Sequence, residues 1–296
     1  MISRDQKRWQ MAAHVVLAVS SALALLPFIL LVIISFTDDK TAIENGYSYL
    51  PAKWSTGAYE YLLQSADKFV RAYGMTILVT LIGTTVCVII TSMLAYMLSK
   101  RSLPGVKVLN FIVVFTMLFN GGLVPTYTIY TTVFHIKNTI WGLIVPNLMM
   151  SAFMIMLVRN YFEHSIPEEL YESARIDGAG EFCIFFKIVI PLSVPILATV
   201  GLMTGISYWN DWQNGLYYLA KDKGGHLYTI QNILNEINTN IAFLASYNAG
   251  GVSSADLPTA TARMAIAVIG ILPIIVIYPF FQKYFAKGLV MGAVKG

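Results

Sequence analysis

The sequence predicts an all-α protein, a polytopic bundle of transmembrane helices. Its composition is 56% hydrophobic and only 12% charged, whereas a soluble domain carries about 25% charged residues. Six apolar runs are each about 20 residues or longer, enough for a helix to cross a bilayer, and none contains Asp, Glu, Lys or Arg. We therefore expect one transmembrane domain, residues 1–296, with six spans at about 11–36, 72–99, 108–134, 138–158, 189–210 and 264–282.

The first span follows a basic N-terminal stretch that contains Arg4, Lys7 and Arg8. Its apolar run is longer than the roughly 7–15 residues of a signal-peptide core, so we expect an uncleaved helix. The short connections on the side of the N-terminus hold Lys and Arg at a higher density than the longer connections on the other side. This bias predicts a multi-pass protein with both termini, and the loop 165–191, in the cytoplasm.

The third span is the one that the sequence interrupts most clearly, with Asn120-Gly121-Gly122 followed by Pro125. Backbone groups freed by such an interruption are tolerated in a membrane only beside protein or water. A broken helix at this depth is typical of a transport site. A kink or close helix packing explains the same residues equally well, since Gly and Pro are common in transmembrane helices.

The fifth span begins near Pro191 and Pro195 and ends in the aromatic stretch 208–212, YWNDW. Aromatic residues at this depth are usually anchors at the membrane interface. A sugar path needs the same chemistry, because apolar sugar faces stack on flat rings while Asn and Asp bind hydroxyl groups. The substrate-path candidates from the interrupted third span and from this aromatic stretch are Asn120, Tyr127, Tyr130, Trp209, Asn210 and Asp211.

The segment 211–263 is a long external stretch, and long segments of this kind are usually functional, so it is a candidate contact for an external partner. The sixth span contains Pro273 and Pro279 and is followed by a basic tail that returns to the cytoplasm.

The loop 165–191 is the most polar stretch between two apolar runs, SIPEELYESARIDGAGEFCIFFKIVIP. Ser165 with Glu168 three residues later reads as a capping box, so a short helix is expected from about 166 to 177. Gly178 should end it with a positive φ, and a second short helix should follow and end at Pro191. A corner with few bulky side chains predicts docking into a groove of a partner.

The same loop carries a motif: Glu172-Ser173-Ala174, three residues, Gly178, nine residues, then Ile188-Val189-Ile190-Pro191. It resembles the EAA loop of ABC importer permeases, E-A-A-x3-G-x9-I-x-L-P, with conservative departures at Ser173 and Ile190. The stretches FNGGLVPTY, YWNDW and YPFFQKYFAKGLVMGAVKG are similar to the maltose-permease-like family of carbohydrate permeases, in its branch for oligosaccharides derived from polysaccharides.

The resemblance implies the permease subunit of an ATP-driven, binding-protein-dependent ABC importer in a bacterial cytoplasmic (inner) membrane. Its partners would be a second homologous permease, a dimer of ATPase subunits, an extracytoplasmic solute-binding protein and an oligosaccharide substrate. The loop would be a coupling helix in a cleft of the ATPase, and the tail 288–296 would touch the ATPase dimer interface. The implied ATPase-coupling residues are Glu172, Ser173, Ala174, Gly178, Ile188 and Pro191.

No residue pattern indicates chemistry within the chain itself. It lacks G-x-x-x-x-G-K-[ST], so ATP and Mg are expected on the partner ATPase, with no cofactor and no enzymatic activity here. Its four histidines are scattered and predict no metal site, and its two cysteines, Cys87 and Cys183, lie too far apart in the topology for a disulfide. The net charge of +4 gives no reason to expect nucleic acid.

Two alternatives have different substrates or energy sources. A secondary carrier is disfavoured, because ion-coupled carriers usually need ionisable residues inside their spans. A permease of the same architecture for a non-sugar solute stays open. The sugar itself is also open: Lys221, Lys223 and Arg263 are compatible with an acidic oligosaccharide such as a uronate polymer, and equally with solvated loop charges.

Overall fold

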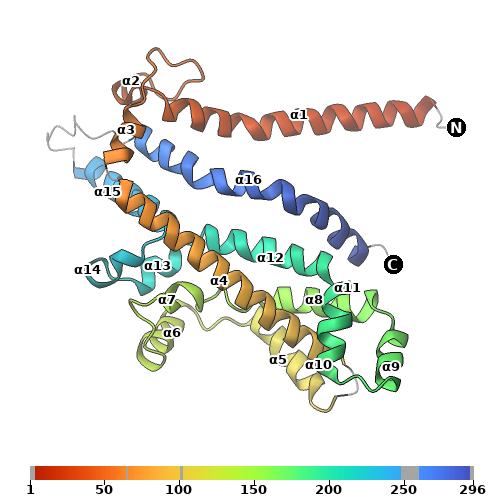
Figure 1. Cartoon of the computed structure of the whole chain (residues 1–296). Coiled ribbons are helices and arrows are strands. Elements are labelled where there is room, and N and C mark those ends of the chain that lie inside the picture. The colour runs from red at the N-terminus through yellow and green to blue at the C-terminus, as the bar shows by residue number, and fades with distance from the viewer. Residues whose placement is uncertain (1–3, 65, 101–102, 248–259, 294–296) are drawn as a thin grey trace. The chain divides into compact units, whose positions relative to one another are not determined.

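The computed structural model of the chain describes residues 4–64, 66–100, 103–247 and 260–293. Within these ranges the backbone consists of helices joined by turns, without a strand, and Thr37 and Trp54 form one isolated bridge (Figure 1). The helical class predicted from the sequence is confirmed. The chain divides into two compact units, Met1–Phe69 with Leu234–Pro273, and Val70–Ile233 with Ile274–Gly296.

The first unit begins with α1 (Arg4–Ser35), one continuous helix of 32 residues. At 1.5 Å per residue such a helix is about 48 Å long, more than the ~30 Å apolar thickness of a bilayer. Only 6% of its most apolar window is buried against the rest of the chain. An apolar surface of this size needs lipid or another protein to cover it.

Two short helices follow α1, namely α2 (Asp39–Glu44) and α3 (Gly57–Gln64). Asp39 ties this part of the unit to α16 (Ala260–Ala293), because its Oδ1 accepts hydrogen bonds from the backbone N–H groups of Ala260 and Thr261 at 3.2 and 3.0 Å. The first N–H groups of a helix lack intrahelical partners, so this carboxylate caps α16 across more than 200 residues of sequence.

The second unit is organised around α4 (Ala66–Ser99), most of which belongs to it, and α12 (Val194–Trp209). The two helices meet where Gly83 lies against the ring of Tyr208, since a Cβ on Gly83 would be 2.5 to 2.7 Å from ring carbons. The hydroxyl of Tyr208 donates to the carbonyl oxygen of Ile144 at 2.7 Å. This buried cluster consists of Val79, Leu143, Ile144, Tyr208 and Leu219.

The third apolar run is broken where the sequence predicted an interruption. After α5 (Val106–Leu118) the chain turns, and α6 (Leu123–Thr128) continues into the π-helical turn η1 (Ile129–Val133), at 116° to α5. Gly122 adopts φ +87°, which glycine reaches without strain, and its N–H donates to Asn120 Oδ1 at 2.8 Å. A straight crossing over 108–134 is therefore not observed.

The fourth predicted span, 138–158, is also not one helix. A single turn, α7 (Trp141–Ile144), is separated from α8 (Ala152–Ser165) by a non-helical stretch. Pro146 has no N–H for a helical hydrogen bond, and Asn147 has φ +61°, so an α-helix does not continue through this pair. The periodicity of the apolar residues did not reveal this break.

The loop 165–191 forms two helical pieces, as predicted, but the first begins later than expected. It is α9 (Glu168–Ile176), whose N-cap is Pro167, and it has no side-chain cap hydrogen bond. The predicted capping box is wrong, because Ser165 is still the last residue of α8 and cannot cap the next helix.

The second piece runs without a gap through α10 (Glu181–Ile184), the π-helical turn η2 (Phe185–Val189) and α11 (Ile190–Leu192). This piece ends at Leu192, one residue after Pro191, so the predicted end at Pro191 is right to within one residue. The chain bends by 78° after Leu192, and the predicted fifth span starts as a helix only at Val194.

The predicted external segment after α12 is largely helical. It contains α13 (Gln213–Tyr218), α14 (Lys221–Gly224), the 3₁₀ turn η3 (Gly225–Leu227) and α15 (Ile230–Tyr247). The part of this segment at 248–259 lies outside the described residues.

Three helices in the described residues are long and apolar enough to cross a membrane, over Lys7–Ser35, Ala66–Ser99 and Ala260–Phe280. Two bent pairs, Val106–Leu118 with Leu123–Val133 and Glu181–Leu192 with Val194–Trp209, bring the number to five if each pair is one span. The expected spans at 11–36, 72–99 and 264–282 thus correspond to continuous apolar helices.

Candidate functional site

The corner between α9 and α10 is built by a glycine turn. Gly178 has φ +80°, as the sequence predicted. Its N–H donates to the carbonyl of Arg175 at 3.0 Å, and the N–H of Ala179 donates to the carbonyl of Ala174 at 2.9 Å. These two bonds are those of a Schellman motif, which satisfies the last carbonyl groups of α9. A Cβ on Gly178 would meet no heavy atom within 4 Å, so only its backbone conformation restricts the residue here.

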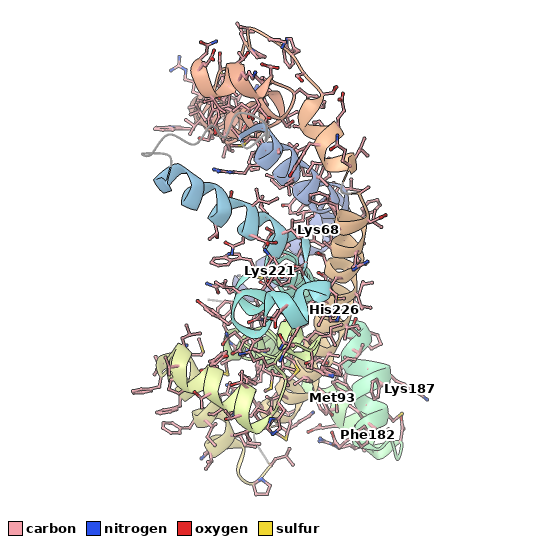
Figure 2. All side chains as sticks on the ribbon, turned by 90° about the vertical axis from the view of Figure 1, so that its left-hand side faces the viewer. Lys68, Met93, Phe182, Lys187, Lys221 and His226 are labelled. Atoms are coloured by element: carbon pink, nitrogen blue, oxygen red, sulfur yellow. The ribbon has the colours of Figure 1, made fainter. Side chains whose placement is uncertain are left out.

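This corner exposes both polar and apolar side chains. Glu172, Ser173, Gly178 and Pro191, all in the predicted coupling motif, are exposed, while its Ala174 and Ile188 are half-buried. Ile176 is 86% exposed and Phe182 is 75% exposed, which is unusual for large apolar side chains. Figure 2 shows Phe182 near Met93, with Lys187 pointing away from the corner. An exposed apolar surface of this kind is typical of a contact with a protein, a membrane or a ligand.

The inner side of the corner is held by charged and aromatic groups that we call the charged brace: Tyr96, Lys100, Tyr171, Arg175 and Glu181. Arg175 Nη2 and Nε donate to Glu181 Oε1 at 2.9 and 3.1 Å, and the Tyr96 hydroxyl donates to Glu181 Oε2. Glu181 therefore connects α9, α10 and α4. Beside it, Met93, Tyr96, Glu181, Phe182 and Phe185 line a pocket of about 150 Å³.

Lys100 completes the brace from the end of α4. Its Nζ lies 3.2 Å from the ring centroid of Tyr171 and 4.7 Å from that of Tyr96, a cation–π arrangement with two rings. Burial lowers the pKa of Lys100 to about 8, and the same burial raises the pKa of Tyr171 to about 12. The hydrogen bond to Glu181 raises the pKa of Arg175. Sequence reasoning missed the brace, although opposite charges on the two sides of Gly178 were a usable signal.

A second group of residues lies at the other end of the unit, where α6, α7, α13 and α14 gather (Figure 1). Two predicted substrate-path residues meet there: the ring of Tyr127 stacks on Tyr218 at 5.8 Å between centroids, and that of Tyr130 meets Tyr218 edge-on at 6.1 Å. Lys137 Nζ donates to the Tyr127 hydroxyl at 2.8 Å. We call Tyr127, Tyr130, Lys137 and Tyr218 the aromatic–lysine corner. Sequence reasoning missed Lys137 and Tyr218.

The other substrate-path candidates lie apart from this corner. Asn120 makes the turn before α6 and has the local role described above. Trp209 is 6% exposed, so it packs inside this chain, with its ring 6.3 Å from that of Tyr73. Asn210 Oδ1 accepts a long hydrogen bond from Gln231, and Asp211 Oδ1 accepts from the N–H groups that start α13.

Trp209 also lines a largely apolar pocket of about 270 Å³ between α4, α12 and α16. The hydroxyl groups of Thr80 and Thr84 line the same pocket and have no hydrogen-bond partner among the described residues. The pocket is therefore mainly apolar, with three threonines of α4, Thr80, Thr84 and Thr85, in its lining.

Buried amides hold the region after α12 in place, and no sequence pattern indicated them. Asn214 donates to the carbonyl of Pro146 at 2.9 Å, and so joins α13 to the break after α7. Asn232 accepts from Thr229 at 2.8 Å and donates to the carbonyl of Trp212 at 2.8 Å. Because these polar groups are buried and hydrogen-bonded, they fix the positions of α13 and of the start of α15.

Comparison with known proteins identifies the family. The family model described as binding-protein-dependent transport system inner membrane component matches residues 7–290. The polygalacturonan/rhamnogalacturonan transport system permease protein YtcP of Bacillus subtilis (strain 168) is 36% identical over 274 residues, 93% of each chain. Protein LplC of the same organism is 34% identical over 275 residues, 93% of this chain and 90% of that protein.

A solved structure extends this likeness to the fold. It is the crystal structure of a bacterial ABC transporter involved in the import of the acidic polysaccharide alginate, and one of its chains is 31% identical, with a TM-score of 0.78. The match covers 96% of this chain and 99% of that chain. The chain described here therefore belongs to the family of inner membrane components of binding-protein-dependent transport systems, the permeases of ABC importers.

Proposed function

We propose that this chain is one of two permease subunits in an ATP-driven importer of oligosaccharides, in a bacterial cytoplasmic membrane with both termini inside. In this proposal it crosses the membrane six times as a single domain, and α7 with α8 makes the fourth crossing. ATP and Mg bind to a dimer of separate ATPase subunits, so the chain itself catalyses no reaction. A solute-binding protein delivers the sugar from outside.

The single observation that carries this proposal is the Gly178 corner. A Schellman turn projects Ile176 and Phe182 from the body of the unit, while the charged brace ties their helices to α4. A rigid, partly apolar projection is suited to dock into a groove, and the brace gives it a mechanical connection to a membrane-spanning helix. Movement of the ATPase would thereby be transmitted to α4 and α12.

Saccharides are the substrate class that the similar proteins support, since one carries polygalacturonan and rhamnogalacturonan in its name and another is described as importing alginate. Within this chain the proposed path uses Asn120, Tyr127, Tyr130, Trp209, Asn210 and Asp211. The stacked rings of Tyr127 and Tyr218 agree with this chemistry, because flat rings bind the apolar faces of sugars.

The test is Gly178→Val. A β-branched residue at φ +80° is strained, so the Schellman turn should open and reorient α10 while the spans stay intact. We expect the assembled transporter to lose the ATPase on co-purification, or to keep it without sugar-stimulated hydrolysis and uptake in proteoliposomes.

Two matched variants control for the size of the side chain. Gly180 has an ordinary φ of −73° and open space around its Cβ position, so Gly180→Val should leave coupling intact. Gly178→Asn, a residue that tolerates positive φ, should restore most of it. Full coupled transport by Gly178→Val would mean that the loop is only a connector, and the proposed function would fail.

A further inference from the structure

The aromatic–lysine corner is a defined arrangement rather than a set of mobile surface side chains. Asn138, next to Lys137, adopts φ +58°. Its N–H donates to the carbonyl of Tyr218 at 2.8 Å, and its Oδ1 accepts from the N–H of Ala220 at 2.6 Å. These two bonds fasten the turn that carries Lys137 to the end of α13 and the start of α14.

Two polar groups of this corner are in direct contact. The Lys137 ammonium contacts the hydroxyl of Tyr127, and its Nζ lies 5.5 Å from the centroid of the same ring. Tyr218 is only 1% exposed, and its hydroxyl has no hydrogen-bond partner among the described residues. Burial raises the pKa of Tyr218, and the nearby phenols of Tyr130 and Tyr127 raise it further. Three phenols and one ammonium thus come together from three parts of the chain.

The charge of the corner is not balanced by a carboxylate. The sequence from 68 to 162 contains no Asp or Glu, and no described residue forms an ion pair with Lys137. Lys221 of the neighbouring α14 and His226 lie at this same end of the unit (Figure 2). An exposed ammonium with a fixed position, aromatic neighbours and no counter-ion favours an anionic ligand that also has an apolar face.

We propose that the aromatic–lysine corner is a subsite for a uronic acid unit, in which Lys137 binds the carboxylate while Tyr127 and Tyr130 contact the sugar ring. This proposal rests on the proposed function, because it names the substrate class of the same permease. The sugar carboxylate replaces the hydroxyl of Tyr127 as the acceptor of Lys137, and the hydroxyl groups of Tyr127 and Tyr130 donate to sugar hydroxyl groups. A charge-assisted bond of this type is roughly twice as strong as a neutral one.

The experiment compares trigalacturonate with its fully methyl-esterified form, which has the same ring but no charge. The assembled transporter is reconstituted in proteoliposomes with the same saturating solute-binding protein in every arm. Any preference of the binding protein for the acid or the ester is then the same for all variants and does not affect their comparison. We expect the wild type to transport the acid faster than the ester. Lys137→Gln should lower the ratio of the acid transport rate to the ester transport rate about tenfold. Lys137→Arg, which keeps the charge, should hold the ratio within about threefold of the wild type.

Lys223→Gln is the matched control, because it removes an exposed charge from α14 without touching the corner, and its ratio should equal that of the wild type. An unchanged ratio in Lys137→Gln, or an equal loss in Lys223→Gln, would overturn the subsite. If the effect of Lys137→Gln followed the anionic lipid content of the vesicles instead of the sugar charge, Lys137 would bind a lipid headgroup and the proposal would be wrong. ATP-dependent uptake of neutral raffinose alone would refute the uronate subsite but leave the proposed function standing, whereas no saccharide uptake at all would refute both.

Discussion

At the scale of single residues, Asp211 has the most informative environment for a titration experiment. It lies within the aromatic stretch 208–212 and accepts hydrogen bonds from the N–H groups of Gln213 and Asn214 at 3.2 and 3.4 Å. Burial raises the pKa of Asp211 to about 6, although these two bonds lower it. The folded protein therefore holds the proton of Asp211 more tightly than the unfolded chain does.

This difference predicts a pH dependence with a definite sign. Between about pH 4 and pH 6 the folded state binds more protons than the unfolded state, so the contribution of Asp211 to stability falls as the pH rises through this window and is level above it. Asp211→Asn keeps an acceptor oxygen but does not titrate. The thermal midpoint of the wild type, measured in detergent, should fall relative to that of Asp211→Asn from pH 4 to pH 6. Parallel curves for the two proteins would contradict the assigned burial.

At the scale of helices, the contact between α4 and α12 depends on a glycine. Gly83 brings the backbone of α4 against the ring of Tyr208, whose hydroxyl is in turn fixed to α7. Small residues allow helices in membranes to approach closely, where van der Waals packing rather than the hydrophobic effect holds them together. Gly74, on the same helix, has no heavy atom within 4 Å of its Cβ position.

The two glycines of α4 should respond in opposite ways to the same substitution. Both gain helix propensity as alanine, up to about 1 kcal/mol. Gly83→Ala must also displace the Tyr208 ring, and overpacking of this kind costs about 1–3 kcal/mol. Thermal unfolding followed by circular dichroism should show Gly74→Ala at or above the wild type and Gly83→Ala below it. Equal midpoints for the two variants would show that the helices do not meet at Gly83.

Helix interruptions show how far local sequence can be interpreted. The sequence Asn120-Gly121-Gly122 predicts a break, because two adjacent glycines and the Asn beside them all have low helix propensity. The break at Pro146 and Asn147 was not predicted, since a lone Pro is common in membrane helices and most Asn residues have negative φ, although Asn tolerates positive φ better than other non-glycine residues do. There the surrounding structure decides, as the carbonyl of Pro146 is bound by the buried amide of Asn214.

At the scale of the whole molecule, the exposed apolar surface indicates how the protein is used. The side chains of α1 are largely uncovered, and those of α5 are too, apart from Val106 and two that are half-buried. A soluble monomer rarely exposes such an area. It needs lipid or another protein to cover it, and the proposed function would supply both the lipid and a second permease subunit.

The proposed topology is tested by cysteine labelling in a background with Cys87→Ser and Cys183→Ser. Ser165→Cys, at the end of α8, should be protected from a membrane-impermeant maleimide added outside intact cells. Ser48→Cys, exposed between α2 and α3, should react. Each change replaces a hydroxyl by a thiol, so folding should be preserved. The reverse labelling pattern would place the Gly178 corner outside, where no ATPase could reach it.

Sequence alone determined the features that depend on composition and on nearby residues. The apolar runs required a helical membrane protein, the E-S-A-x3-G-x9-I-x-I-P motif indicated the permease family, and Gly178 indicated a left-handed turn. The first follows from the solvation of a segment, the second from a resemblance carried by residues close together in sequence, and the third from the dihedral freedom of one residue. None of the three needs knowledge of what lies far away in the chain.

Only the tertiary structure decided how distant residues meet. Glu181 binds Tyr96 across 85 residues, Asn214 binds Pro146 across 68, and Tyr218 stacks on Tyr127 although α13 and α6 are far apart in sequence. The strength of such contacts depends on burial and on geometry of a few tenths of an ångström, which no local pattern encodes. The charged brace and the aromatic–lysine corner therefore became visible only when the helices were packed together.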